Sequence, residues 1–202
     1  MPDLLLGMPA MAELPDLHAN VDLARRLGLG LVELNMNLPQ YTPQRLPPES
    51  VQRSAEATGL AFTLHLPEET DVASFHPAVR DGHLACCVAA LAWCRGAGIR
   101  LVNMHLAPGV YFTLPDRRMW LYEQHRGEFL DHLAASFDVL VTAADDHGVT
   151  LCIENAGLFH LPFMRDAVAR LLEMHPSRLA LTWDLGHDAA TGDLERPLFQ
   201  TY

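Results

Sequence analysis

Two stretches of the sequence end in an acidic side chain directly after a short apolar run. They are Thr150–Gly157 (TLCIENAG), with Glu154, and Leu179–Asp188 (LALTWDLGHD), with Asp184. Each run has the length and composition of a buried β-strand. The two carboxylates are 30 residues apart (184 − 154), about one strand–helix unit. We therefore expect Glu154 and Asp184 at the C-terminal ends of neighbouring or near-neighbouring parallel strands.

Two earlier stretches have the same form but end in histidine. They are Ala61–Pro67 (AFTLHLP), with His65, and Leu101–Gly109 (LVNMHLAPG), with His105. Parallel strands bring their C-terminal ends to one edge, so the four side chains should converge. Carboxylates and imidazoles gathered in this way suit a divalent metal such as Mn²⁺, Mg²⁺ or Zn²⁺. The alternatives are carboxylates that cap helices or pair with arginine, and histidines that hydrogen-bond to the protein or to a substrate hydroxyl.

Strand-like and helix-like segments alternate along the whole chain. Strands are expected at about 4–8, 31–36, 60–66, 100–106, 149–155 and 179–185, and helices at about 16–28, 47–58, 77–97, 119–147 and 164–175. Glycine marks the ends of four expected helices, at Gly28, Gly59, Gly98 and Gly148. Such alternation predicts an α/β fold with a parallel sheet covered by helices. The one long connection, Leu106–Arg118, is expected to be a functional loop.

Five of the expected strands share one pattern of side chains. Successive residues of a strand point to opposite faces. Here one face is large and apolar, whereas the other is small or polar and ends in a ligand-type side chain. The polar faces hold Glu33 and Asn35, Thr63 and His65, Asn103 and His105, Cys152 and Glu154, and Thr182 and Asp184. A doubly wound sheet would bury both faces under helices. The pattern instead predicts a TIM-type (β/α) barrel with its site at the C-terminal strand ends.

Composition narrows the function classes. The formal net charge is −11, and all 14 basic residues are arginine. An acidic chain repels phosphate backbones, so we expect no nucleic acid partner. The absence of lysine excludes a Schiff-base mechanism. The four cysteines lack CxxC spacing, which indicates reduced thiols in a cytoplasmic protein. No apolar run approaches the roughly 18 residues of a membrane span, so no membrane association is expected.

Four residues are expected to contact a substrate: His187, Glu33, Asn155 and Tyr111. A turn at Gly186 lets His187 face the same site as Asp184. Tyr111 lies in the long loop, where an aromatic ring can stack on a sugar face or anchor the loop. Glu33 can line the floor of the pocket or pair with an arginine.

Four motifs occur in order along the chain: HLP (65–67), HLAPG (105–109), IENAG (153–157) and WDLGHD (183–188). Together they resemble the xylose isomerase-like TIM-barrel superfamily, which contains sugar and sugar phosphate isomerases and epimerases and the family-2 AP endonucleases. The resemblance implies that Glu154 and Asp184 ligate a divalent metal, and that Glu154 also serves as the catalytic acid/base of the isomerases. It implies that His187 contacts substrate. In the endonucleases the positions of His65, His105 and His187 supply additional zinc ligands.

The superfamily pattern continues beyond the strands found here. Its seventh strand carries a histidine ligand and its eighth a glutamate, whereas only 18 residues (202 − 184) follow Asp184. We therefore expect one domain over residues 1–202, a barrel truncated after strand six, in a fragment or a shortened member. Its open edges would favour self-association as a homo-oligomer. The missing ligands and second acid/base would leave this chain alone inactive, or nearly so, as an isomerase.

The leading function is a metal-dependent isomerase or epimerase of a small sugar or sugar phosphate. A metal would polarise the carbonyl, and a carboxylate would move a proton through an enediolate. One alternative is a metal-dependent phosphodiesterase like AP endonuclease IV, and the other is an inactive truncated barrel or binding module. A trinuclear zinc site would select the endonuclease, a single Mn²⁺ or Mg²⁺ the isomerase, and no metal the remnant.

Overall fold

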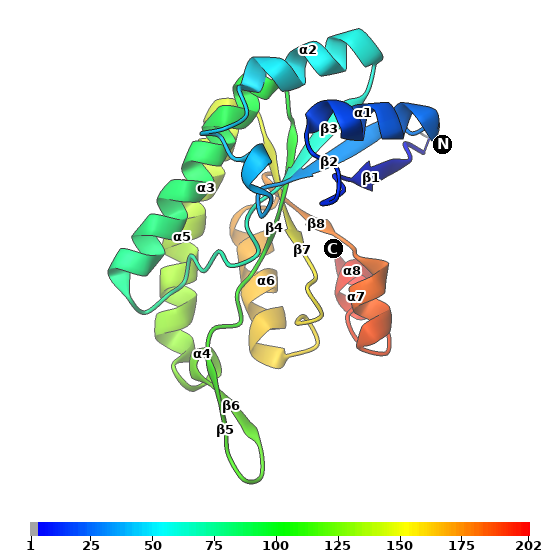
Figure 1. The fold of residues 1–202 in the computed structure, drawn as a ribbon. Coiled ribbons are helices and arrows are strands. Elements are labelled where there is room, and N and C mark those ends of the chain that lie inside the picture. Colours follow the sequence, from blue (N-terminus) through cyan, green and yellow to red (C-terminus); the bar gives the residue numbers. More distant parts are fainter. Residues whose placement is uncertain (1–3) are drawn as a thin grey trace.

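A six-stranded parallel sheet is the centre of the computed structural model, which describes residues 4–202 (Figure 1). The strands pair in the order β1 (Gly7–Pro9), β2 (Leu31–Asn35), β3 (Ala61–His65), β4 (Leu101–His105), β7 (Thr150–Glu154) and β8 (Leu179–Thr182). Strands that follow one another in this sheet are neighbours in space, as in a TIM barrel. Within the described residues, β1 and β8 are the two edges of the sheet and do not pair with each other. The fold is therefore α/β and TIM-barrel-like, as the alternating pattern predicts.

Helices connect successive strands and cover the outer face of the sheet. They are α1 (Leu17–Arg26), α2 (Pro48–Thr58), α3 (Pro77–Ala97), α5 (Arg126–His147) and α6 (Pro162–Met174). Figure 1 shows α2, α3 and α5 following one another along this side of the molecule. Gly59, Gly98 and Gly148 end three of these helices with φ values of 74°, 72° and 66°. Only glycine adopts this left-handed conformation without a steric penalty, so the predicted helix ends are confirmed.

The apolar faces of the strands form the core against these helices. Their fully buried residues include Val32, Leu34, Leu64, Val102, Met104, Leu151 and Ile153. Burying one such side chain stabilises the fold by roughly 1.5–3 kcal/mol. The alternation of the strands leaves the polar side chains on the opposite, inner face.

A β-hairpin interrupts the long connection after β4. It consists of β5 (Tyr111–Thr113) and β6 (Arg118–Trp120), closed by a hydrogen bond of 2.8 Å from Leu114 N to Arg117 O. The single helix expected at about 119–147 is wrong at its start, because β6 and the short α4 (Leu121–Gln124) precede α5. Figure 1 shows the hairpin projecting from the rest of the molecule.

The two ends of the sheet also differ from the prediction. The first strand covers residues 7–9 rather than about 4–8, and β8 stops at Thr182 rather than near 185. Asp184 begins the short helix α7 (Leu185–Ala190), which is followed by α8 (Arg196–Thr201). A one-turn 3₁₀-helix, η1 (Pro39–Tyr41), also follows β2. In the part of the chain described here, no helix is both long and apolar enough to cross a membrane.

Candidate metal and active site

The inner face of the sheet carries a layer of polar side chains joined across four strands. Asn103 Nδ2 donates to Glu33 Oε2 at 2.6 Å, and Thr63 Oγ1 donates to the same oxygen at 3.3 Å. Thr182 Oγ1 donates to Asn103 Oδ1 at 2.6 Å. These bonds place β2, β3, β4 and β8 around one concave surface, as the barrel prediction requires.

Cys152 belongs to this same layer and is buried. Burial raises the pKa of its thiol, the charge of Glu33 raises it further, and a hydrogen bond with Thr182 lowers it. The side chain therefore stays a neutral thiol near pH 7. It lies two residues before Glu154 on β7, one layer below that carboxylate.

A second layer stands at the C-terminal strand ends and gathers His65, His105 and Glu154. His105 is paired with Glu154 in the register of β4 and β7. Glu154 Oε1 lies 3.6 Å from His105 Nε2, and its Oε2 lies 3.7 Å from His65 Nε2. The two rings meet edge to face with centroids 4.8 Å apart. Both distances are too long for hydrogen bonds, so three ligand-type groups face one another without being bonded.

The same glutamate is shared with a second group of ligand atoms. One ligand atom from each of Glu154, Asp184 and His187 lies within 4.8 Å of the others, and the same limit holds for His65, His105 and Glu154. Asp184 Oδ1 also accepts a hydrogen bond from His187 N at 2.7 Å and so caps α7. The helix-cap alternative thus holds for one oxygen of Asp184 and leaves the other oxygen for the cluster.

The cluster has the properties of a divalent-metal site. Leu66 O can only accept, so His65 Nδ1 donates to it at 2.6 Å, and Nε2 is the ring nitrogen that faces Glu154. Among residues 4–202, His105 Nε2 is buried and has no hydrogen-bond partner. Such an orphaned nitrogen beside a buried carboxylate is costly unless a cation or proton lies between them. Imidazole nitrogens and carboxylate oxygens are ligands suited to Zn²⁺ and Mn²⁺.

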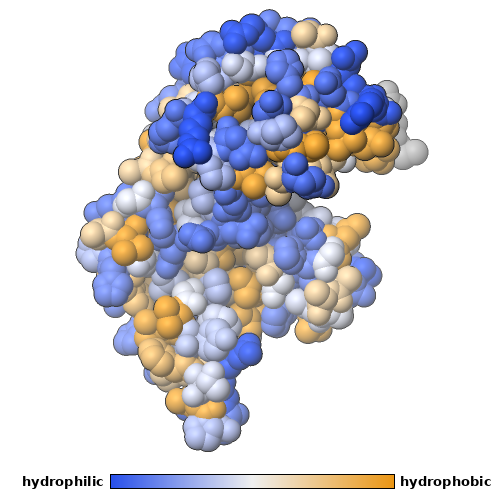
Figure 2. Space-filling view, in the orientation of Figure 1, coloured by the Kyte–Doolittle hydropathy of each residue, from blue (hydrophilic) through white to orange (hydrophobic). Residues whose placement is uncertain are grey.

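The cluster itself is largely buried, with His65 5% and Glu154 8% exposed. Figure 2 shows a hydrophilic hollow between the part formed by α1 and β1 and the part formed by α7 and α8. A groove of about 770 Å³ lies elsewhere, between α1 and α2. It is lined by Leu17, Arg25, Leu46 and Arg53 among others and contains none of the clustered ligands. The volume of a groove therefore does not identify the candidate metal site in this protein.

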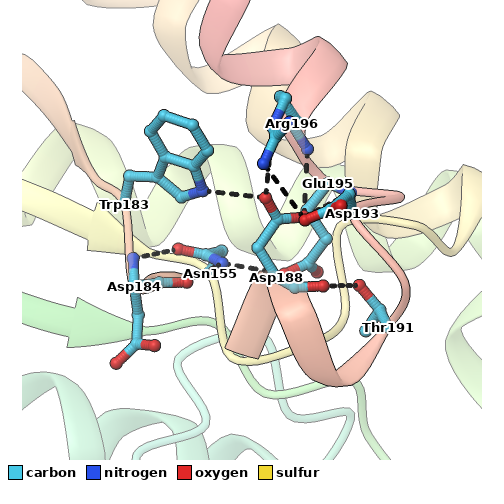
Figure 3. Close-up of polar contacts among 8 residues, drawn as sticks. All are labelled: Asn155, Trp183, Asp184, Asp188, Thr191, Asp193, Glu195 and Arg196. Atoms are coloured by element: carbon cyan, nitrogen blue, oxygen red, sulfur yellow. Dashed lines mark hydrogen bonds and ion pairs between the residues drawn. The ribbon is translucent and has the colours of Figure 1, made fainter. Parts of the chain in front are cut away.

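Three of the four predicted substrate residues have other contacts. Asn155 is fully buried and bonds to Asp184 (Figure 3). Glu33 is held in the lower layer by Asn103, without an arginine partner among the described residues. Tyr111 lies on the hairpin against Trp120, with Arg118 over its ring. Their contacts with substrate stay predictions, whereas His187 lies in the cluster itself.

Two buried carboxylates near the C-terminus were not predicted to matter. Asp188 and Glu195 are each 1% exposed. Trp183 Nε1 donates to Asp188 Oδ2 at 3.1 Å, and Asn155 Nδ2 donates to Glu195 Oε2 at 2.8 Å (Figure 3). Asp188 belongs to the WDLGHD motif, but no local pattern distinguishes Glu195 from a surface glutamate.

The fold and the cluster together define an α/β TIM-barrel-like protein with ligand-type side chains at its C-terminal strand ends. The family model described as a xylose isomerase-like TIM barrel matches residues 21–200, and the chain belongs to this family. This confirms the resemblance read from the four motifs. A comparison with curated protein sequences finds no match.

Solved structures share the fold at low sequence identity. A D-tagatose 3-epimerase-like protein aligns with TM-score 0.71 and 18% identity over 95% of this chain and 68% of its own. The 3-keto-D-glucoside 4-epimerase YcjR from E. coli aligns with TM-score 0.74 and 16% identity over 98% and 75%. The IOLI protein with a zinc atom aligns with TM-score 0.70 and 13% identity over 94% and 66%. The chain thus spans about two thirds to three quarters of the length of these proteins.

Proposed function

We propose that the chain binds a divalent metal through Glu154, Asp184, His105 and His65, and that it carries the metal ligands and one acid/base of an isomerase or epimerase of a small sugar or sugar phosphate. The observation that carries the proposal is the meeting of two imidazoles and two carboxylates around Glu154, with His105 Nε2 buried and unpaired among the described residues. The structurally similar IOLI protein binds a zinc atom, which supports metal binding in this fold.

The residues of the cluster would have different roles in the reaction. When bound, a divalent ion would supply Lewis-acid polarisation of a substrate carbonyl and its neighbouring hydroxyl. Glu154, which is 8% exposed, would hold the proton removed from the carbon next to the carbonyl and return it through an enediolate. His187, whose ring centroid lies 6.0 Å from that of His105, would orient a substrate hydroxyl. Asn155 is bonded to Asp184 and would reach substrate only at the expense of those bonds.

The substrate class is inferred from the neighbours and from the donor atoms of the cluster. The names of two similar structures are those of sugar epimerases, one of them for a 3-keto glucoside. A polyhydroxy carbonyl compound presents the adjacent oxygens that a metal and neutral imidazoles can hold. We propose the same compound class as the partner of this chain, with the reducing cytoplasm as its compartment, because all four cysteines are unpaired within residues 4–202.

Proton exchange at carbon is the direct test of this function. Ketoses and their phosphates are incubated in D₂O with the chain and Mn²⁺, and deuterium at the carbon next to the carbonyl is followed by NMR. This exchange needs only the one acid/base that the chain carries, Glu154, whereas full isomerisation needs the second one. We expect exchange to disappear in the Glu154→Gln variant. It should persist in Glu173→Gln, which changes an exposed glutamate of α6. Metal binding with no exchange for any ketose would contradict the isomerase proposal.

A second candidate is favoured by one observation. Two overlapping ligand groups share Glu154 and include three imidazoles, which is a donor set able to hold more than one ion. A zinc-dependent phosphodiesterase of the AP endonuclease type would use such a set. The net charge of −11 and the absence of lysine disfavour binding of a DNA backbone. Cleavage of abasic DNA with zinc, without any exchange at carbon, would select this candidate.

A further inference from the structure

Asn155 holds the backbone of Asp184 at both of its polar groups. Its Oδ1 accepts from the Asp184 N–H at 2.6 Å, and its Nδ2 donates to the Asp184 carbonyl at 3.0 Å. Figure 3 shows the Asp184 carboxylate pointing away from these bonds. The Cα from which the proposed ligand extends is therefore fixed by a single, fully buried amide.

That amide can work in only one of its two orientations. If it were rotated by 180°, its NH₂ would face the Asp184 N–H and its oxygen would face the Asp184 carbonyl. Glu195 favours this same orientation, because its Oε2 accepts from Asn155 Nδ2 at 2.8 Å. An ionised carboxylate has acceptors only, so it accommodates the NH₂ of Asn155 and repels its oxygen.

Glu195 is itself fixed by the turn between α7 and α8. Its second oxygen accepts from the Phe159 N–H, which also ties the turn to the loop after β7. The backbone N–H groups of Glu195 and Arg196 donate to Asp188 Oδ1 at 3.0 and 3.2 Å. Trp183 Nε1 donates to the other oxygen of Asp188 (Figure 3). A carboxylate that is 1% exposed costs free energy to bury, and here hydrogen bonds to two amide groups offset that cost.

We propose that Glu195 is a positioning residue for Asp184, acting through the amide of Asn155. Its Oε2 holds Asn155 in the working orientation while its Oε1 is fixed by the Phe159 N–H, and Asn155 in turn holds the backbone position of Asp184. The inference rests on the proposed role of Asp184 as a metal ligand. It assigns the turn between α7 and α8 to the metal site, although none of its residues belongs to either ligand group.

The substitution Glu195→Gln tests this series of hydrogen bonds from Glu195 through Asn155 to Asp184. Phe159 N–H requires an acceptor, so the new NH₂ group would face Asn155 Nδ2, donor against donor. Rotating the Asn155 amide would remove this clash, but it would then place NH₂ against the Asp184 N–H and oxygen against the Asp184 carbonyl. Adding Asn155→Asp restores an acceptor opposite the new NH₂ group and keeps the acceptor for the Asp184 N–H, at the cost of a repulsion with the Asp184 carbonyl. The combined variant should therefore recover part of what the single variant loses.

The experiment measures Mn²⁺ affinity by calorimetry, the absorption spectrum of bound Co²⁺, and the free energy of unfolding without metal. Glu195→Gln should weaken Mn²⁺ binding about 10- to 100-fold, the range typical of outer-shell partners, and change the Co²⁺ spectrum. Glu173→Gln carries the same change of charge at an exposed position and should change neither. The combined Glu195→Gln, Asn155→Asp variant should bind more tightly than Glu195→Gln.

The possible results separate this inference from the proposed function. An unmodified chain that binds no metal would contradict the metal site and, with it, the inference. An unmodified chain that binds metal, beside a Glu195→Gln variant of equal affinity and spectrum, would contradict the positioning role alone. If Glu195→Gln does not fold, the combined variant carries the test. Folding with measurable Mn²⁺ binding supports the inference, and folding without it contradicts it.

Discussion

His105 Nε2 lies 3.6 Å from Glu154 Oε1, and both atoms are acceptors when the imidazole is neutral at that nitrogen. Two acceptors held this close in a buried setting repel each other unless a proton or a cation lies between them. His65 Nε2 stands in the same relation to the other oxygen of Glu154, at 3.7 Å. The arrangement therefore becomes favourable when a proton or a cation lies between these atoms, and a bound metal ion would fill that role for both pairs.

The polar layer beneath the cluster should contribute to stability. Asn103→Ala would remove the closest donor to Glu33 Oε2 and the acceptor of Thr182 Oγ1. Leaving such groups unpaired typically costs about 1–3 kcal/mol, so the free energy of unfolding in urea should fall by that amount. Thr63→Val, which removes only the longer bond of 3.3 Å, should cost less. An unchanged unfolding free energy in Asn103→Ala would mean that the hydrogen bond to Glu33 does not stabilise the fold. That result would favour the predicted contact of Glu33 with substrate.

Two glycines should respond in opposite directions to the same substitution. Gly59 ends α2 with a φ of +74°, a conformation that costs an L-residue roughly 1–2 kcal/mol, so Gly59→Ala should lower the free energy of unfolding. Gly82 lies inside α3, where an added Cβ would meet nothing within 4 Å. Gly82→Ala should therefore raise the free energy of unfolding by about 0.5–1 kcal/mol. Equal effects of the two changes in thermal or urea unfolding would contradict the assigned helix end.

The buried thiols should resist alkylation in the folded protein. Burial raises the pKa of Cys87 and of Cys94 to about 12, so at pH 8 almost none of either thiol is the reactive thiolate. Cys86 is exposed. Iodoacetamide followed by mass spectrometry should show one rapid modification, at Cys86, and four in urea. The Cys86→Ser variant is the control and should show no rapid modification, whereas rapid labelling of Cys87 or Cys94 would contradict their placement in the core.

The alternation of large apolar and small polar residues was sufficient to predict most of the fold. Val102 and Met104 point to the helices while Asn103 and His105 point inward, so the pattern of β4 gives both its face and its end. The start of α5 could not be predicted in this way. The hairpin before it depends on the hydrogen bond between Leu114 and Arg117 and on the pairing of β5 with β6, neither of which has a periodic signal.

The candidate site was predictable where its residues end strands, and unpredictable where they act from a distance. Glu154 and Asp184 stand at positions that strand geometry selects. Glu195 reaches Asn155 across 40 residues of sequence, and a glutamate in an irregular turn gives no indication of burial. The length of β8 was overestimated because Asp184 caps the helix α7 and does not belong to the strand. The short apolar segment before Asp184 fits a continued strand equally well by its sequence.

Metal binding by the cluster is the central claim, and a calorimetric titration with Mn²⁺ tests it most directly. The unmodified chain, Glu154→Gln, Asp184→Asn and the exposed control Glu173→Gln are compared, with the unfolding free energy of each measured without metal. We predict binding to the unmodified chain and the control. Each ligand variant should lose more than the roughly 10- to 100-fold typical of outer-shell changes. The metal-free Glu154→Gln protein should be no less stable, because its amide can donate to His105 Nε2. Mn²⁺ affinities that are equal in all four proteins, or binding to none of them, would contradict the account.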